Sequence, residues 1–238
     1  MGKIFDLEYM VSTIPEIIQY LPVTLEIALI SGIIALILGF AVAMVRVFRI
    51  KVLSQICVIY ISFIRGTPAM VQLLVAYYGI PIFLKGINES LGTNFNVMGI
   101  SANVFAVAAL SLNSGAFMSE TIRSAILSVE AGQLEACYSV NMTTMQAMRR
   151  VVLPQAFAVA LPPLGNSLIS LLKETSLIFN ISVIEMMAAA KIVGARSFRF
   201  FEVYIVVALI YWVCCFVLER ILILMEKHVR VYERRTVK

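Results

Sequence analysis

Five stretches of this chain are apolar for long enough to cross a lipid bilayer, which takes about 20 residues of helix. This feature limits the fold most, because only helices and closed barrels satisfy their backbone hydrogen bonds inside lipid. The second stretch is too long for one untilted span and is interrupted by Arg65-Gly66-Thr67-Pro68. The expected spans are residues 23–45, 52–84, 100–122, 154–172 and 200–225. We therefore predict an all-α integral membrane protein with five transmembrane helices.

The composition favours the same fold class. Only 14% of the 238 residues are charged, whereas soluble domains carry about a quarter, and this deficit disfavours a soluble protein with a large core. We predict one membrane domain over residues 1–238, with a core at 21–227 and a polar loop at 123–153 between the third and fourth spans. No segment has the shape of a cleavable signal peptide, so we expect the first apolar segment to be retained.

The placement of basic residues predicts the orientation of the chain. With the N-terminus outside, the cytoplasmic segments carry 11 of the 19 Lys and Arg residues and the external segments carry five. We therefore predict a multi-pass protein of the bacterial cytoplasmic membrane with its C-terminus inside. The 11 residues are Arg46, Arg49, Lys51, Arg123, Arg149, Arg150, Lys227, Arg230, Arg234, Arg235 and Lys238.

The net charge of +5 does not indicate a nucleic-acid partner. The charge is concentrated at span ends and in the tail, residues 226–238, where no patterned aromatic residues could stack bases. We expect this tail to lie near anionic membrane lipid.

The loop at 123–153 has the pattern of a helical hairpin. Asn141 suits the left-handed position that ends a helix, and Thr143 with Gln146 fits a capping box for the next helix. If Gly132 or Asn141 has a positive φ, it will tolerate β-branched residues poorly. About 30 residues far exceed the usual connection of about 2–8, so we predict a docking element. The apolar residues expected on one face of the second helix are Met145, Met148 and Val152.

This loop resembles the "EAA" loop of ATP-binding-cassette (ABC) importer permeases, whose pattern is Glu-Ala-Ala, three residues, Gly, nine residues, Ile-x-Leu-Pro. The matching residues are Glu135-Ala136-Cys137, Asn141 and Val151-Val152-Leu153-Pro154. The spacing is intact, with Cys137 for alanine, Asn141 for glycine and Val151 for isoleucine. In that family the loop enters a groove on the ATP-binding subunit. The resemblance implies this coupling role for Gly132, Glu135, Ala136, Asn141, Leu153 and Pro154.

Three further segments are similar to the polar amino-acid subfamily of these permeases. They are Arg65-Gly66-Thr67-Pro68 with Val71-Gln72 and Tyr77-Tyr78-Gly79, Leu112 to Phe117 with Glu120 and Arg123, and Lys173 to Leu177. The Glu-Ala-Cys variant, with the run from Glu174 to Phe179 and the pair Glu185-Met186, is most similar to permeases for cystine and related sulfur amino acids. The resemblance implies two ATP-binding subunits, an extracytoplasmic solute-binding protein, and a second permease that is identical or homologous.

Polar residues within the spans are the candidates for contact with a transported amino acid, because such groups usually face a protein interior or a cavity. A zwitterion needs both donors and acceptors, which residues 173–176 supply. The alternatives are structural: a helix break at Arg65, close helix packing at residues 113–115, an ion pair between Glu120 and Arg123, and an ion pair between Glu174 and a neighbouring helix. The candidates are Arg65, Gln72, Asn113, Ser114, Lys173, Glu174, Thr175 and Ser176.

The sequence contains no catalytic constellation, no metal-spaced ligands and no Gly-rich phosphate loop. We therefore expect no enzyme activity and no cofactor on this chain, with ATP bound and hydrolysed by a partner subunit. Two alternatives to an amino-acid importer are a secondary transporter driven by an ion gradient and a membrane scaffold without a transport function. An ion-driven secondary transporter would typically show internal repeats and more spans, and a membrane scaffold would not need charges within its spans.

Overall fold

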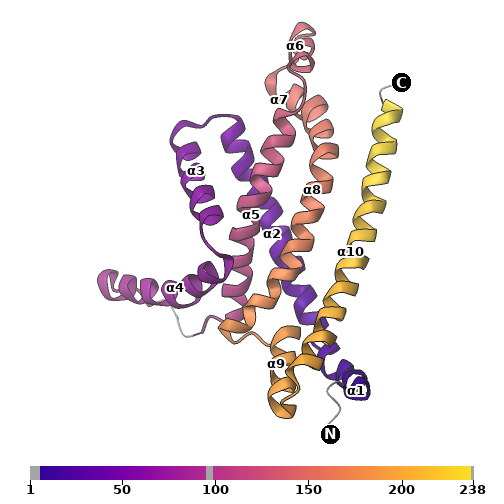
Figure 1. The fold of residues 1–238 in the computed structure, drawn as a ribbon. Coiled ribbons are helices and arrows are strands. Elements are labelled where there is room, and N and C mark those ends of the chain that lie inside the picture. The colour runs from indigo at the N-terminus through magenta and orange to yellow at the C-terminus, as the bar shows by residue number, and fades with distance from the viewer. Residues whose placement is uncertain (1–5, 95–98, 237–238) are drawn as a thin grey trace.

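The computed structural model describes residues 6–94 and 99–236, with side chains up to residue 229, and all regular structure in these residues is helical (Figure 1). Five helical stretches in this part of the chain are long and apolar enough to cross a membrane, which confirms the predicted fold class. They are α2 (Leu21–Val47), α4 (Ala69–Leu91), α5 (Ala102–Leu127), the stretch Thr144–Ile181 and α10 (Phe200–Thr236).

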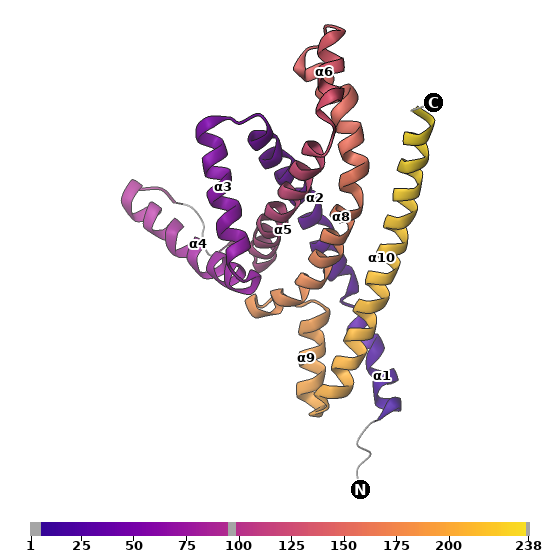
Figure 2. The ribbon, with the colours of Figure 1, turned by 45° about the horizontal axis from the view of Figure 1, so that its top comes forward.

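Shorter helices lie at the two ends of the bundle. The end at which α6 and α7 project is called the hairpin end here, and the opposite end, with α1 and α9, the far end (Figures 1 and 2). The shorter helices are α1 (Leu7–Ile18), α6 (Ala131–Ser139), α7 (Thr144–Ala147) and α9 (Met186–Ser197). The other elements are α3 (Lys51–Gly66) and the parts of the stretch Thr144–Ile181 that follow α7, which are the π-helical turn η1 (Met148–Val152), α8 (Leu153–Glu174) and the 3₁₀ turn η2 (Thr175–Ile181).

Helix α5 is the centre of the fold and packs most closely against α2. A Cβ atom added to Gly39 of α2 would come within 3.1 Å of the Gly115 carbonyl oxygen and of the Met118 Cβ on α5. Small residues allow this approach, and membrane helices without bulky interface residues associate in this way. The α2 residues of this stripe, all buried, are Ser31, Ala35, Gly39 and Ala43.

The stretch expected to span the membrane as residues 52–84 consists of two helices. Helix α3 returns beside α2, whereas α4 turns away from the bundle to one side (Figures 1 and 2). The chain breaks at Thr67 and Pro68, whose extended backbone separates the two helices. A proline lacks an N–H and disfavours a helical residue before it, so the helix ends there.

Helix α1 is fastened to the far end of the bundle by ion pairs. Arg199 pairs with Asp6 at the start of α1, and Arg196 of α9 lies 3.6 Å from Glu16. The two pairs join segments that are about 190 residues apart in sequence, so they hold the first helix against α9 and the start of α10. Of the basic residues used to predict the orientation, Lys3 and Lys238 lie outside the described residues.

Candidate functional site

Gln72 caps the break between α3 and α4. Its side-chain amide donates to the carbonyl oxygens of Ile64 at 2.8 Å and Thr67 at 3.0 Å, and to the Thr67 hydroxyl at 2.8 Å. The last carbonyls of a helix have no partner within the helix, and Gln72 satisfies one of them, at Ile64, together with the carbonyl of the capping residue Thr67. The interruption that the sequence indicated is therefore a break between two helices that side-chain hydrogen bonds stabilise, and it is called the α3–α4 joint here.

Asn113 on α5 is bound to the same joint. Its amide nitrogen donates to the side-chain oxygen of Gln72 at 2.8 Å, and the Asn113 residue is only 5% exposed. Ser114 is equally buried, next to Gly115 in the contact with α2. The structure thus brings together two predicted candidates, Gln72 and Asn113, in a hydrogen bond that joins α4 to α5.

Arg65 lies just before the break and is exposed. Its guanidinium carbon is 5.7 Å from the centre of the Phe117 ring on α5. This distance is within the range of a cation–π contact.

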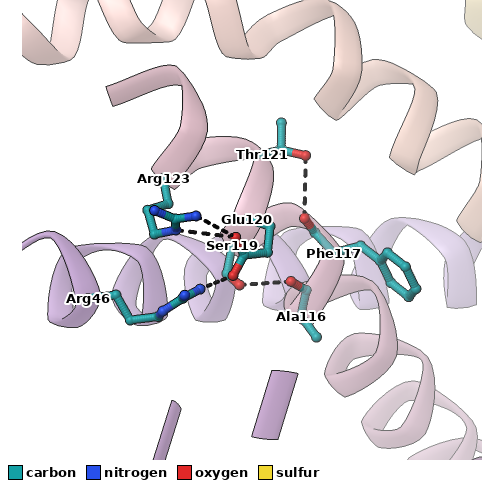
Figure 3. Close-up of polar contacts among 7 residues, drawn as sticks. All are labelled: Arg46, Ala116, Phe117, Ser119, Glu120, Thr121 and Arg123. Carbon is teal, nitrogen blue, oxygen red and sulfur yellow. Dashed lines mark hydrogen bonds and ion pairs between the residues drawn. The ribbon is translucent and has the colours of Figure 1, made fainter. Parts of the chain in front are cut away.

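The ion pair expected between Glu120 and Arg123 is present and includes a third residue (Figure 3). Arg123 donates to one oxygen of Glu120 from Nε at 3.2 Å and from Nη2 at 3.0 Å. Arg46, near the end of α2, contacts the other oxygen. One carboxylate is therefore held between two guanidinium groups from two helices, at the hairpin end. The sequence indicated Arg46 only as part of a basic turn, because its partner is distant in the chain.

The segment Lys173–Ser176 lies where α8 passes into the tighter turn η2. The hydroxyls of Thr175 and Ser176 each donate 2.7 Å bonds to carbonyls three residues earlier, so the local backbone occupies them. Lys173 is exposed, and one carboxylate oxygen of Glu174 is buried without a hydrogen-bond partner among the described residues. A buried acceptor without a partner is costly, so Glu174 stands out among these candidates.

The two groups of candidates lie against different helices. Thr175 approaches Tyr211 of α10, with 3.4 Å between their hydroxyls, whereas Asn113 bonds to Gln72 of α4. In the part of the chain that the structure describes, no hydrogen bond links one group to the other. They therefore form two separate polar regions.

A buried carboxylate that the sequence did not single out as a site connects four elements at the far end. Glu185 is fully buried and accepts hydrogen bonds from the Ala188 N–H at 3.0 Å, the Tyr211 hydroxyl at 2.9 Å and the Thr24 hydroxyl at 3.4 Å. Burial raises the pKa of the Glu185 carboxyl, and its hydrogen bonds act in the opposite direction. Glu185 caps α9 and ties it to α2 and α10, with Thr175 of η2 beside Tyr211. Glutamate is not among the preferred N-cap residues, so the sequence carried no local signal for this role.

The hairpin has the helix ending predicted for it. Asn141 has a φ of +57°, and its N–H donates to the Tyr138 carbonyl at 3.0 Å. The N–H of Met142 donates to the Cys137 carbonyl, also at 3.0 Å. This pair of bonds is the Schellman ending, in which asparagine can take the place of glycine. Gly132 differs, because its φ is not positive and a Cβ there would meet open space.

The second half of the hairpin begins with the predicted capping box. The Gln146 N–H donates to the Thr143 hydroxyl at 3.3 Å, and the Thr143 N–H donates to the Gln146 side chain at 2.9 Å. The chain then continues through η1 into α8, so that α7, η1 and α8 form one rod. In the π turn the Leu153 N–H bonds to the Met148 carbonyl. The wide turn accommodates Pro154, which has no N–H to donate.

The three apolar residues predicted on one face of the second helix differ in how deeply they are buried. Met148 and Val152 are buried against α2, α5 and α8, but Met145 is 67% exposed. It lies in the four-residue helix α7 at the tip, beyond this core cluster. Tyr138 and Val140 on the other arm are also exposed, so the tip presents apolar side chains outward.

Comparison with known proteins identifies the family. Residues 35–231 match the binding-protein-dependent transport system inner membrane component. The chain belongs to this family. It is thus the permease component of an ABC importer, a multi-pass protein of the inner membrane, and not itself an enzyme. Family membership implies ATP-binding subunits and a binding protein as partners, and excludes the secondary transporter and the scaffold.

Relatives and solved structures cover nearly the whole permease. It is 45% identical over 222 residues to the probable amino-acid ABC transporter permease protein PatM of Vibrio harveyi, covering 93% of this chain and 95% of PatM. It is 38% identical over 239 residues to the L-cystine transport system permease protein TcyL of Bacillus subtilis (strain 168), covering 100% and 97%. A crystal structure of an amino acid ABC transporter with histidines aligns with a TM-score of 0.81 at 35% identity, covering 95% of this chain and 100% of that one.

Proposed function

We propose that this permease carries a polar amino acid across the membrane, with cystine or a related sulfur amino acid as its substrate. The observation that supports the proposal is the full-length similarity to permeases named for amino acids, among them the L-cystine permease TcyL. Two of these permeases, identical or homologous, enclose one pathway, with two ATP-binding subunits at the hairpin end and the solute-binding protein at the far end.

The test of this function is uptake by the assembled transporter. The permease, its ATP-binding subunits and its solute-binding protein are reconstituted in liposomes and supplied with radiolabelled amino acids. We expect ATP-dependent uptake of L-cystine, reduced by unlabelled sulfur amino acids and not by sugars. Uptake of another amino acid would reject the cystine assignment, and no amino-acid uptake would reject the function.

The hairpin couples the permease to its ATP-binding subunits. Glu135 and Ala136 lie exposed on α6, and the exposed apolar side chains of Tyr138 and Met145 suit a groove on a partner. The exposed carboxylate of Glu135 can pair with a basic group of that groove. Glu135→Arg should therefore weaken assembly or uptake. Normal uptake and normal ATPase stimulation in this variant would remove Glu135 from the coupling contact.

The hairpin end faces the cytoplasm, as the distribution of basic residues indicates. The C-terminus lies at the same end (Figure 1). A Thr236→Cys variant should therefore react with a membrane-impermeant maleimide only after cells are opened. Labelling in intact cells would reverse the proposed orientation.

The intramembrane candidates contribute polar contacts to the pathway, and Glu174 is the foremost because one of its oxygens is buried without a partner. Glu174→Gln keeps the shape and removes the charge, and Asn113→Ala removes the bond to Gln72. At least one variant should change the apparent affinity or selectivity for the transported amino acid. Unchanged kinetics in both, at normal expression, would leave the pathway without a specific site at these residues.

A further inference from the structure

An open cavity of about 430 Å³ lies along α3 and is completed by Arg46 of α2. Its lining includes one arginine from each helix and a serine hydroxyl, and its volume is within the range of small-molecule sites. The lining residues are Arg46, Val58, Ile61, Ser62, Arg65 and Gly66.

The two arginines reach this cavity from opposite ends. Arg46 is near the end of α2, and Arg65 is near the end of α3, which runs back beside α2 (Figures 1 and 2). Side chains in a helix tilt toward its N-terminus. In two antiparallel helices, residues near the two C-terminal ends therefore tilt toward each other, which explains why one cavity collects both guanidinium groups.

The surroundings of the cavity carry excess positive charge. Glu120 is shared between Arg46 and Arg123, so one carboxylate faces two cations (Figure 3). Arg65 stacks against the Phe117 ring, which neutralises no charge. Among the described residues, three guanidinium groups thus meet one carboxylate, a surplus of two positive charges.

Such a surplus on a membrane-spanning chain favours an anionic ligand. Isolated charges within a bilayer are costly and are usually paired. A guanidinium has five donors in a planar fork that matches carboxylate and phosphate groups, so Arg46 retains donors beyond its contact with Glu120. We propose that this cavity binds an oxyanion group, either the α-carboxylate of the amino acid in transit or the phosphate of a membrane lipid. The first source rests on the proposed function, and the second does not.

The charge of the cavity can be measured without any transport activity. Ser62 is exposed and lines the cavity, so Ser62→Cys places a thiol inside it. The permease with its ATP-binding subunits, in phosphatidylcholine nanodiscs, is treated with an anionic and a cationic methanethiosulfonate. Both rates are divided by those of the same reagents with a free thiol, and the chain without Ser62→Cys gives the background from native cysteines.

We expect the corrected rate of the anionic reagent to exceed that of the cationic reagent several-fold. The ratio of the anionic to the cationic rate should fall several-fold when Arg65→Gln is added. The matched control is Arg220→Gln, since Arg220 on α10 also stacks on a phenylalanine ring, at 4.7 Å, but does not line the cavity. This control should leave the ratio unchanged. A ratio that does not respond to Arg65→Gln would overturn the proposal.

Protection of the same thiol separates the two sources of the oxyanion. Slower reaction with L-cystine, L-histidine or L-glutamine in phosphatidylcholine nanodiscs assigns the α-carboxylate. Slower reaction of an uncharged methanethiosulfonate when part of the phosphatidylcholine is replaced by phosphatidylglycerol, without amino acid, assigns the phosphate of an anionic lipid, because an uncharged reagent does not respond to the changed surface potential. Protection by neither would overturn the oxyanion site. Because these readouts need no uptake, they remain interpretable if the uptake assay rejects the proposed function.

Discussion

Helices α5 and α4 are both apolar and long enough to cross a membrane, yet the fold uses them in opposite ways. Of the most apolar window of each helix, 61% is buried in α5 and only 6% in α4. Helix α5 contacts α2, α3, α4 and α8, whereas α4 is held chiefly by α5 and η2. The comparison teaches that apolarity indicates membrane compatibility and does not indicate which helix forms the core of the chain.

The exposed apolar face of α4 follows a regular pattern. Its most exposed large residues recur at helical spacing, so they lie along one side. Those at this spacing are Val71, Val75, Tyr78 and Ile82, with Phe83 beside them, whereas Leu91 at the end of the helix is equally exposed but lies off this side. This single chain leaves that side uncovered, whereas the corresponding sides of α5 are occupied by its own helices.

We expect the largest difference in the yield of folded protein between two glycine variants, one at the α2–α5 contact and one on α4. Gly39→Leu places a side chain 3.1 Å from the Gly115 carbonyl oxygen, and backbone atoms cannot move aside as a flexible side chain can. Overpacking costs about 1–3 kcal/mol and sometimes more, so we expect loss of most monodisperse protein in size-exclusion chromatography. The control is Gly79→Leu on α4, where a Cβ meets only a Val75 methyl at 3.8 Å. Equal yields from both variants would contradict the central role of the α2–α5 contact.

A smaller but still large effect is expected at the buried carboxylate of the far end. Glu185→Ala leaves the Tyr211 hydroxyl and the Ala188 N–H without their shared acceptor. Each unsatisfied buried group costs about 1–3 kcal/mol, so the melting temperature should fall by several degrees. Glu219→Ala, on an exposed face of α10, serves as the control. An equal shift in both variants would show that Glu185 does not hold the elements together.

The joint between α4 and the core should give an intermediate effect. Gln72→Leu removes the partner of the Ile64 and Thr67 carbonyls and of the Asn113 amide. Because Gln72 is only partly buried, water can replace some of these bonds, and we expect a loss of about 1–2 kcal/mol. Proteolysis between α3 and α4 should become faster than in wild type. An unchanged cleavage rate would mean that α4 is held by its apolar contacts alone.

The hairpin should affect coupling more than stability. Asn141→Val forces a β-branched residue into a left-handed conformation, at a cost of about 1–2 kcal/mol confined to the tip. We expect ATPase stimulation to fall while the melting temperature stays near that of wild type. Asn141→Gly is the matched control, since glycine adopts the positive φ of this position without strain. Equal losses of stimulation would show that the backbone of Asn141 is not the cause.

The smallest effect concerns the pH dependence of stability. Burial raises the pKa of Glu185 in the folded protein, so the folded state holds this proton more tightly than the unfolded state. The contribution of Glu185 is therefore greatest below the ordinary glutamate pKa of about 4.3 and decreases as the pH rises through the folded value. Glu185→Gln should flatten this decline in melting temperature, measured from acidic to neutral pH. A steeper decline in the variant would contradict the direction of the shift.

The parts of the fold that could be predicted from the sequence depend on local patterns. Hydropathy located four of the five membrane helices but merged α3 and α4 into one stretch. Asn141 and the Thr143–Gln146 pair predicted the hairpin turn, and the Arg-Gly-Thr-Pro interruption marked the break after α3. Each of these signals acts within a few residues, where backbone geometry and capping bonds are determined.

The parts that could not be predicted depend on contacts between distant residues. Arg46 meets Glu120 only after α2 and α5 have packed, and Glu185 meets Thr24 across about 160 residues of sequence. The direction in which α4 leaves the bundle is likewise set by Gln72 and Asn113 together. One missed signal was available, because Ser31, Ala35, Gly39 and Ala43 recur every four residues and mark a close helix contact.

The π turn at Met148–Val152 determines which motions of the hairpin tip can reach the membrane. Since α7, η1 and α8 follow one another without a gap in the helical backbone, we expect a push along the axis at the tip to reach the first turns of α8, before the Pro162–Pro163 pair. Rotation is different, because a turn with an extra residue is wider and its hydrogen bonds can shift register. We therefore expect this stretch of helix to transmit a push along its axis more directly than a rotation about its axis.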